Sequence, residues 1–497
     1  MDKAVKAGAY MSILISIDQG TTSTRTIAYD HELNVLHSFQ KEYLLSFPRD
    51  GWVEVDPEHL MASVYETLDP ILANNIEISG LGISNQRETT LVWDCETGEP
   101  VYPGIVWQDR RTAAMCDDLI GAGHQKTVSS KSGLLLDPYF SSTKIAWMLD
   151  NIEGLREKAG AGLLRFGTVD TFMLWQLSGG MHHKTDVTNA SRTNLFNIHT
   201  LDWDDELLEL FRVPRSMLPE VLPSASHFGA FARAGKSIKV TGMIGDQQSA
   251  MVGQKCFAEG DMKATFGTGC FLMVNSGTKP QGSNAGLLST VGYQLNQEMS
   301  YALEGSIFSA GTIIQWLRDN MKFFDEAKDS ENLLHEYGES NGVIFVPAFT
   351  GIGAPHWNSE VRASFYGITR DTSKQDMITA AFKALIYQVM DLRDALIIDG
   401  VKIQNLLIDG GMATNRRFCQ LLANFLEQEI SVPRNTESTA MGAAITAGIG
   451  AGVFAGSEDI KSMHSQLNIF RPQALSTNAN DRINWQKFLK VLMEAYN

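Results

Sequence analysis

Residues 13–30 read ILISIDQGTTSTRTIAYD, and this stretch decides the fold class. An apolar run ends at Asp18, a polar turn containing Gly20 follows, and a second apolar run begins beyond Arg25; this pattern is typical of a β-hairpin. Residues 262–276, MKATFGTGCFLMVNS, repeat the pattern around a Gly-Thr-Gly turn. Two such hairpins, far apart in the chain, predict two domains of similar plan, each hairpin lying in a sheet of its own.

The whole chain alternates between strand and helix patterns, which predicts an α/β protein. Its 497 residues exceed what one ordinary core accommodates, so two domains are expected. A third strand-to-glycine turn, LLIDGGMATN at 406–415, leads into a helical pattern. We place the domain boundary just before the second hairpin, which gives an N-terminal domain at 12–254 and a C-terminal domain at 255–497. Residues 1–10 look like an extension before Met11.

Composition excludes several classes of function. The net charge of −16 makes nucleic acid an unsuitable partner, because a binding face for it needs clustered Lys and Arg. Five scattered cysteines without a C-x-x-C pair indicate neither a disulfide framework nor a zinc site, and they fit a cytoplasmic location. No secretory signal is evident at the N-terminus. The uncharged run 440–456 is rich in Gly and Ala, which favours a tightly packed soluble helix over a membrane span.

The turn of the first hairpin has the chemistry that a phosphate chain requires. Thr21, Thr22 and Ser23 offer hydroxyls, and Arg25 offers a fork-shaped cation. Asp18, at the strand end, is placed to hold Mg²⁺ directly or through water. The alternative is an ordinary hairpin turn with solvated hydroxyls. The Walker A pattern G-x-x-x-x-G-K-[ST] is absent from the chain.

Two further positions follow apolar strand patterns, where ligand groups gather in α/β sheets. Arg87 and Glu88 come after ISGLGIS, and a surface ion pair is the alternative interpretation of this pair. Asp246 comes after TGMIG and before a helical pattern. A carboxylate there can act as a general base, and a helix N-cap is the alternative.

These motifs together resemble a known superfamily. The set D-Q-G-T-T-S-x-R, F-G-T-G-C-F and D-G-G resembles the sugar kinase, actin and Hsp70 ATPases. Within it, residues 139–151, YFSSTKIAWMLDN, look like the first motif of the FGGY carbohydrate kinases, and 364–382 look like the second. Lys383 departs from the second motif, where the family has an acidic residue or Gln. We interpret this departure as a change on a helix surface. The resemblance implies two ribonuclease-H-like, actin-like domains with an active-site cleft between them.

Further motifs are most similar to the branch of this family that phosphorylates glycerol. They lie at 85–90, 106–111, 137–140, 167–171, 188–193, 245–248, 301–305 and 347–351. The resemblance implies transfer of phosphate from Mg-ATP to glycerol, giving sn-glycerol 3-phosphate in the first step of glycerol catabolism. It also implies a homodimer or homotetramer.

The same resemblance assigns roles to individual residues, with Asp246 as the general base and Asp18 as the Mg²⁺ ligand. The residues implied to hold glycerol are Arg87, Glu88, Trp107, Tyr139, Asp246, Gln247 and Phe271. Of these, Trp107 and Phe271 would supply apolar walls and Tyr139 a phenolic hydroxyl, although aromatic residues are more commonly plain core. The residues implied to hold ATP are Thr21, Thr22, Ser23, Arg25, Thr268, Gly311, Gln315, Gly411 and Asn415.

Two competing functions and one regulatory feature remain to be weighed. A kinase for another polyol or sugar shares the fold, and a non-catalytic ATP-binding regulator belongs to another class. The pairs Arg87-Glu88 and Trp107-Gln108 argue against the first, and the presence of Asp246 and Asp18 argues against the second. Some members of the family bind fructose 1,6-bisphosphate through a Gly-Gly-Lys-Gly-Gly loop. Residues 231–237 read FARAGKS here, so the glycine-rich pattern is largely lost, although Lys236 keeps one cation. The sequence therefore does not predict inhibition by fructose 1,6-bisphosphate.

Overall fold

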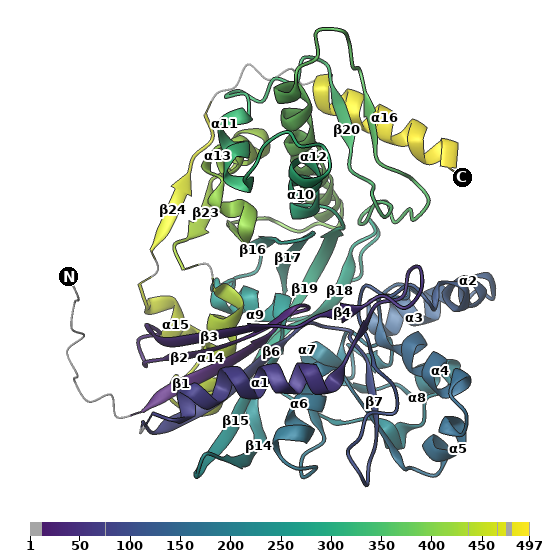
Figure 1. Cartoon of the computed structure of the whole chain (residues 1–497), viewed down its shortest axis with the longest axis vertical. Helices are drawn as coiled ribbons and strands as arrows, with labels where there is room; N and C mark the ends of the chain where they lie inside the picture. Colours follow the sequence, from purple (N-terminus) through teal and green to yellow (C-terminus); the bar gives the residue numbers. More distant parts are fainter. Residues whose placement is uncertain (1–11, 75, 436, 465, 474–479, 497) are drawn as a thin grey trace.

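The computed structural model describes residues 12–74, 76–435, 437–464, 466–473 and 480–496. The extension proposed at residues 1–10 lies outside these residues. Two halves are stacked along the long axis of the molecule, and strands run through both (Figure 1). The α/β class predicted from the sequence is confirmed.

One thirteen-stranded sheet extends from one half into the other. In spatial order its strands are β24 (Leu467–Phe470), β23 (Ile430–Pro433), β22 (Leu406–Asp409), β16 (Met262–Phe266), β17 (Cys270–Gly277), β19 (Glu298–Ile307), β18 (Leu288–Leu295), β14 (Ala225–Arg233), β15 (Lys236–Gly245), β6 (Ile78–Asn85), β1 (Ile13–Gln19), β2 (Ser23–Tyr29) and β3 (Val35–Glu42).

The two predicted hairpins are β1–β2 and β16–β17, and both are antiparallel pairs. In each half the first hairpin strand also pairs in parallel with a strand distant in the chain, β6 or β22. A further parallel strand follows, β15 or β23. The prediction of two units of similar plan is therefore confirmed.

The prediction that each hairpin lies in a separate sheet is wrong. The half-sheets meet where β14 and β18 pair in parallel at one position, Ala225 opposite Leu295. An open strand edge exposes unpaired backbone groups, and at this one position the inner edges of the two half-sheets pair with each other. The two halves are thus joined by backbone hydrogen bonding as well as by side chains.

Helices cover the N-terminal half-sheet with contributions from both ends of the chain. Helix α1 (Pro57–Leu72) packs against β2 and β3, whereas α14 (Ser438–Gly450) packs against β1, β6, β15 and α9 (Asp246–Gly253). A Cβ added at Gly82 would lie 2.1 Å from the carbonyl oxygen of Ala443, so the helix lies directly on the strands. The tightly packed helix predicted within 440–456 is confirmed. Among the described residues, the structure has no helix of the length and apolarity needed to cross a membrane.

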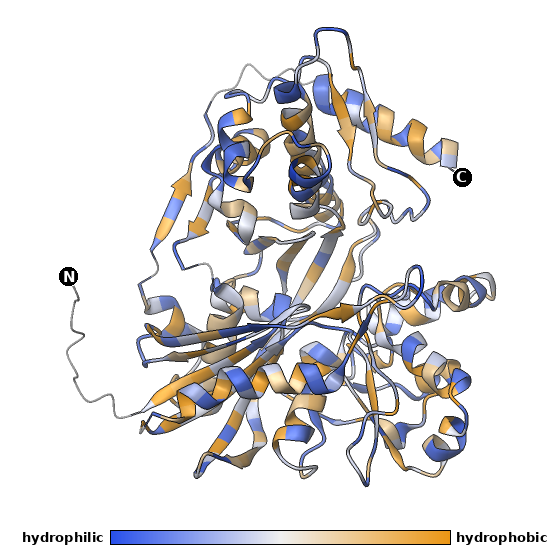
Figure 2. Ribbon diagram, in the orientation of Figure 1, coloured by the Kyte–Doolittle hydropathy of each residue, from blue (hydrophilic) through white to orange (hydrophobic). Residues whose placement is uncertain are grey.

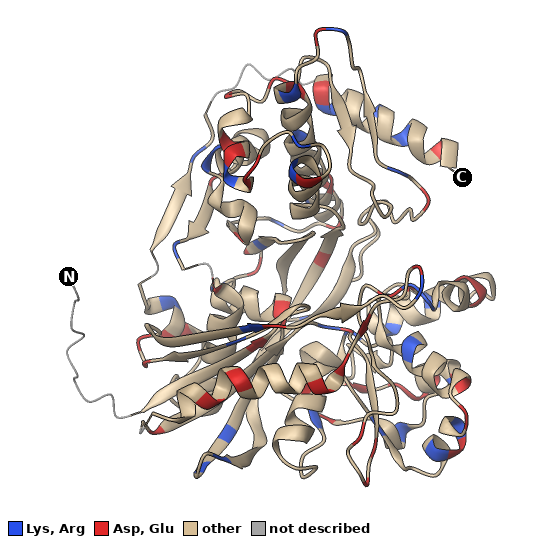
Figure 3. Cartoon of the chain, in the orientation of Figure 1, with Lys and Arg blue, Asp and Glu red and all other residues tan. Residues whose placement is uncertain are grey.

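Because α14 returns to the N-terminal half, the chain crosses between the halves more than once. The limits 12–254 and 255–497 stay a prediction, as does the cleft between the halves. Figure 2 shows hydrophobic residues along the strands and the inner helix faces of both halves, and Figure 3 shows acidic and basic residues interspersed over both. The two largest buried apolar clusters lie in different halves, one around Phe266 and Phe382 and the other around Ile15 and Leu60.

The C-terminal half carries α10 (Gly311–Asp319), α12 (Lys374–Ile398), α13 (Arg416–Leu426) and α16 (Asn480–Tyr496). Lys383 on α12 is buried, and its Nζ lies 2.6 Å from Oδ2 of Asp481 on α16. The interpretation of Lys383 as a helix-surface feature is therefore wrong, because α16 covers that face of α12. A buried ammonium requires such a partner.

The remaining elements are short. The strands are β4 (Leu45–Ser46), β5 (Glu54–Val55), β7 (Leu91–Asp94), β8 (Gly104–Ile105), β9 (Leu164–Gly167), β10 (Lys184–Asp186), β11 (Phe196–Asn197), β12 (Asp202–Trp203), β13 (Glu220–Leu222), β20 (Ile344–Val346) and β21 (Ser364–Tyr366). The α-helices are α2 (Ala113–Gly121), α3 (Gln125–Ser132), α4 (Ser141–Asn151), α5 (Leu155–Gly160), α6 (Val169–Leu177), α7 (Val187–Ala190), α8 (Asp205–Phe211), α11 (Ser330–Leu333) and α15 (Ser457–Ser462). The 3₁₀ turns are η1 (Arg215–Met217), η2 (Ala327–Asp329) and η3 (Gly411–Thr414).

Candidate active site

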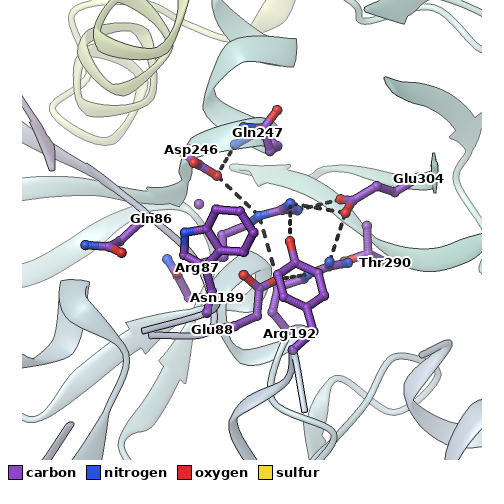
Figure 4. A network of polar contacts seen from close by, with 12 residues as sticks. Gln86, Arg87, Glu88, Asn189, Arg192, Asp246, Gln247, Thr290 and Glu304 are labelled. Atoms are coloured by element: carbon purple, nitrogen blue, oxygen red, sulfur yellow. Dashed lines mark hydrogen bonds and ion pairs between the residues drawn. The ribbon is translucent and has the colours of Figure 1, made fainter. Parts of the chain in front are cut away.

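Two neighbouring parallel strands end at the same edge of the N-terminal half-sheet and bring the predicted residues together. Strand β6 ends at Asn85, just before Arg87 and Glu88, and β15 leads directly into α9 at Asp246. Nε of Arg87 lies 3.2 Å from Oδ1 of Asp246 (Figure 4). Glu88 has a φ of 62°, so the chain turns sharply after Arg87. Both Arg87 and Glu88 are almost fully buried, which rules out a surface ion pair.

The helix-cap interpretation of Asp246 is also ruled out. The N-cap of α9 is Gly245, and Asp246 lies inside the first turn. Its Oδ1 accepts a hydrogen bond from the backbone N–H of Gln247 at 2.7 Å. A carboxylate at a helix N-terminus is stabilised by the helix dipole. About a quarter of the Asp246 side chain, 28%, remains exposed, so a ligand can reach it.

Three aromatic rings lie beside these polar groups. The ring of Trp107 makes edge contacts with Tyr139 and Phe271, at centroid distances of 5.7 and 5.9 Å. The hydroxyl of Tyr139 accepts a hydrogen bond from Nη2 of Arg87 at 3.5 Å. Phe271 belongs to the C-terminal half, on β17. The structure therefore brings together all seven residues implied to hold the polyol, and their roles as ligands stay a prediction.

Trp107 also links this group of residues to the first hairpin. Its indole N–H donates to Oγ1 of Thr21 at 2.9 Å. Ser23 accepts a hydrogen bond from Gln40, and Thr22 is exposed. The tip of the first hairpin turn is therefore hydrogen-bonded to one of the three aromatic side chains.

Arg25 is already engaged in this structure. Its guanidinium forms an ion pair with Glu437, at the start of α14, and donates to Oε1 of Gln40 at 2.6 Å. Its charge still acts on Asp18, the predicted Mg²⁺ ligand. Burial, followed by the negative charge of Asp246, raises the pKa of Asp18 to about 7, and Arg25 opposes the shift.

The raised pKa of Asp18 provides a test of whether the site suits Mg²⁺. Two carboxylates that repel each other at the end of one half-sheet fit a divalent cation, which would offset their mutual repulsion. No cluster of three or more His, Cys, Asp or Glu side chains suited to a metal occurs among the described residues. Mg²⁺ needs only one or two carboxylates when phosphate and water supply its other ligands. The residues present therefore fit the ion.

The nucleotide residues predicted in the C-terminal half gather around the second hairpin. The backbone N–H of Gly311 donates to the carbonyl oxygen of Gly267 at 2.9 Å, and that of Ala310 donates to the carbonyl oxygen of Thr268 at 2.9 Å. A Cβ at Gly410 would lie 2.3 Å from the carbonyl oxygen of Phe266, so the D-G-G turn packs on the same strand. Three glycine-containing turns thus lie against one another.

The other residues predicted to hold ATP in the C-terminal half are exposed or cap a helix. Gly411 has open space where a side chain would stand, and Gln315 is exposed on α10. Asn415 is the N-cap of α13, and its Oδ1 accepts a hydrogen bond from the backbone N–H of Phe418 at 2.9 Å. The structure therefore places these residues around the three turns, and nucleotide binding by them stays a prediction.

Sequence reasoning missed two buried charged residues at the centre of the site. Glu304 on β19 accepts hydrogen bonds from Arg87, at 2.6 and 3.1 Å, and from Nη2 of Arg192 at 2.9 Å (Figure 4). Nε of Arg192 donates to Oε1 of Glu88 at 2.6 Å. Both lie in motifs noted above, 188–193 and 301–305. The signal that could have revealed Glu304 is an acidic residue inside an apolar strand pattern.

Two buried lysines were also missed. Nζ of Lys263 on β16 donates to Oε1 of Gln247 on α9, and so connects the two halves. Burial lowers its pKa, and Asp409 is the main group opposing the shift. Burial likewise lowers the pKa of Lys144 to about 8, and its Nζ donates to the carbonyl oxygen of Tyr139 at 2.7 Å.

The loop that corresponds to the fructose 1,6-bisphosphate motif is the β14–β15 turn. Its two cations already have partners: Arg233 pairs with Asp69 at 2.5 and 2.7 Å, and Lys236 donates to the carbonyl oxygens of Asn74 and Ile76. These contacts hold both side chains against the end of α1 and the segment that follows it.

Comparison with known proteins shows what the chain is similar to. The N-terminal domain of the FGGY family of carbohydrate kinases matches residues 13–253, and its C-terminal domain matches residues 262–451. "Glycerol kinase 1" of Pseudomonas aeruginosa is 48% identical over 484 residues, 96% of this chain and 98% of that protein. "Glycerol kinase" of Bacillus subtilis is 44% identical over 489 residues, 97% of this chain and 99% of that protein.

Solved structures give the same result for the fold. The crystal structure of Plasmodium falciparum glycerol kinase with ADP has a TM-score of 0.89 at 34% identity and covers 98% of each chain. A ligand-bound xylulose kinase from Lactobacillus acidophilus has a TM-score of 0.85 at 21% identity, with 97% of each chain covered. At that identity the second likeness concerns the fold alone.

Proposed function

Because the chain belongs to the FGGY family of carbohydrate kinases, we propose that it transfers the terminal phosphate of ATP to glycerol, forming sn-glycerol 3-phosphate. Relatives 44% and 48% identical along nearly their whole length carry the name glycerol kinase. The observation that carries the proposal is the contact between Asp246 and Arg87 at the edge of the half-sheet, in a chain this similar to those relatives.

A small neutral polyol offers hydroxyls and a short carbon edge. Arg87 and Glu88 supply a donor and an acceptor for neighbouring hydroxyls, and Trp107 and Phe271 face the carbon edge. Asp246 takes the proton of the attacking hydroxyl as the bond to phosphorus forms. These roles are supported by the convergence of the side chains on one place.

On the nucleotide side, the glycine turns offer backbone N–H groups and little steric bulk to a phosphate chain. Thr21 and Thr268 lie on opposing hairpins and would contact the phosphates from either side. Asp18 would hold Mg²⁺, directly or through water, and the bound ion would neutralise charge on the phosphates. In phosphoryl transfer, catalysis consists chiefly of such positioning and charge stabilisation.

A coupled assay of ADP formation tests the proposal. Purified protein with Mg-ATP should consume ATP rapidly with glycerol and slowly with xylulose, ribulose, erythritol or dihydroxyacetone. Addition of EDTA in excess of Mg²⁺ should stop the reaction. A preference for xylulose or ribulose would refute the substrate assignment, and equal ATP consumption with and without any polyol would refute the kinase reaction. Oligomeric state and cytoplasmic location stay predictions.

A further inference from the structure

The residues proposed to hold the polyol hydroxyls belong to the N-terminal half, yet a carboxylate from the C-terminal half lies among them. Glu304 is in the middle of β19, opposite Met273 on β17 and Leu288 on β18. Its side chain is fully buried. Burying an unpaired carboxylate within a sheet costs on the order of several kcal/mol of folding free energy. The partners of Glu304 therefore indicate what the residue does.

Both oxygens of Glu304 are used, and both partners are arginines of the N-terminal half. Oε2 accepts from Nη1 of Arg87 at 2.6 Å, and Oε1 accepts from Nη2 of Arg87 at 3.1 Å. Oε1 also accepts from Nη2 of Arg192 at 2.9 Å. Burial alone would raise the pKa of Glu304, but Arg192 and Arg87 outweigh it and lower that pKa to about 2, so the carboxylate stays charged.

The network continues from Arg192 to the second polyol residue. Nε of Arg192 donates to Oε1 of Glu88 at 2.6 Å, and its guanidinium lies over the rings of Phe140 and Tyr139, at 5.3 and 5.7 Å. Glu304 therefore orients Arg87 directly, and it orients Glu88 through Arg192 (Figure 4).

After Glu304, the carboxylate nearest to Arg87 is that of the proposed base, Asp246, and Glu88 lies farther off, with its Oε1 3.9 Å from Nε. Nε of Arg87 already lies 3.2 Å from Oδ1 of Asp246, while the two Nη atoms are bound to Glu304. If the negative charge of Glu304 were removed, Asp246 would be the nearest carboxylate, and the Arg87 guanidinium could form a bidentate ion pair with it. Such a bidentate pair would occupy the carboxylate that must accept the hydroxyl proton.

We propose that Glu304 is a positioning residue of the polyol site, which holds the two Nη groups of Arg87, so that only Nε contacts Asp246, and which fixes Glu88 through Arg192. This inference rests on the proposed function. Under this proposal the C-terminal half takes part in polyol recognition. A movement of β19 relative to β6 would displace the side chains of Arg87 and Glu88, which are proposed to bind the hydroxyls.

A purely structural tether between the halves would make different predictions. It would lower thermal stability and leave the kinetic constants of the folded enzyme unchanged. A positioning residue changes the KM for the polyol and leaves the KM for ATP as it was. A rise in the KM for glycerol without a rise in the KM for ATP therefore distinguishes a positioning residue from a structural tether.

The test replaces Glu304 by Gln, which keeps the shape and removes the charge, and by Asp, which keeps the charge and shortens the side chain. The matched control is Asp391→Asn, a buried carboxylate of the same half that accepts from Arg482 at 2.8 Å. We expect E304Q to raise the KM for glycerol by about tenfold or more. We expect E304D to give an intermediate rise, with the KM for ATP within about threefold of wild type in both variants. D391N should lower the melting temperature with both KM values unchanged.

Several outcomes would overturn the proposal. They are a folded E304Q enzyme with the wild-type KM for glycerol, an equal rise in both KM values, and failure of both Glu304 variants to fold. Glycerol binding to wild-type protein, measured by calorimetry, separates this test from that of the proposed function. If wild-type enzyme uses another polyol, the substrate assignment fails, and the same comparison made with that polyol still decides the role of Glu304.

Discussion

Replacement of Gly311 by Ala tests how closely the nucleotide turns must pack. An added Cβ would lie 2.5 Å from the carbonyl oxygen of Gly267, whereas ordinary contacts begin at 3.4 Å. The two turns would have to separate by about 0.9 Å, and a displacement near 1 Å can cost about 10²-fold in rate. We therefore expect kcat/KM for ATP to fall by about 10²-fold, or about 2.7 kcal/mol of transition-state stabilisation. The KM for glycerol should stay near the wild-type value.

The assay is steady-state kinetics with varied ATP at saturating glycerol, together with a thermal melt. Gly282→Ala is the matched control, because Gly282 lies in the same half and a Cβ there would have nothing within 4 Å. G282A should behave as wild type. A folded G311A enzyme with a wild-type kcat/KM for ATP would refute the argument that the second hairpin and α10 form one phosphate-binding unit.

Three further predictions concern other parts of the molecule. Trp107→Phe removes the hydrogen bond from the indole to Thr21, worth about 1 kcal/mol net, so the KM for glycerol should rise about fivefold in steady-state assays; an unchanged KM would refute this link. Trp485→Ala deletes a buried side chain of α16, so urea denaturation should show a loss of about 3–5 kcal/mol with normal kinetics in the folded enzyme, and a smaller loss would contradict burial of that helix. Asp376→Asn tests a pH effect. Burial would raise the pKa of Asp376, but hydrogen bonds led by those from Ser373 outweigh it and lower that pKa. The charged carboxylate therefore stabilises the fold fully above the unfolded-state pKa of about 3.9. This contribution is lost as the pH falls through the lowered pKa of the folded state. Urea curves should therefore show D376N to be less stable at pH 7 by about 1–3 kcal/mol, with a difference that narrows below pH about 4.

The sequence predicted those features of the fold that depend on local pattern. Glycine between two apolar runs located both hairpins, and a polar residue after an apolar strand located Arg87 and Asp246. The continuous sheet could not be predicted, because Ala225 and Leu295 pair across about seventy residues and neither carries a local signal. The burial of Lys383 was missed for a similar reason, since its partner Asp481 lies on a helix far along the chain.

Within the candidate site, the predicted residues came from motifs of the family, and the missed residues are buried charged side chains that contact them. Glu304, Arg192 and Lys263 are hydrogen-bonded to other side chains. A motif that is defined by ligand contacts therefore does not identify them. An isolated charge in an apolar strand pattern indicates only that a partner must exist. Identifying that partner requires the three-dimensional arrangement of both halves.

The measurement that tests the central claim most directly is ³¹P NMR of the product formed by wild-type protein and by Asp246→Asn. Wild-type protein with Mg-ATP and glycerol should give the resonance of sn-glycerol 3-phosphate at the expense of the γ-phosphate signal. D246N should fold normally, bind glycerol and form this product about 10²–10⁴-fold more slowly. Absence of glycerol 3-phosphate with the wild-type protein, or its formation at the wild-type rate by D246N, would contradict the account.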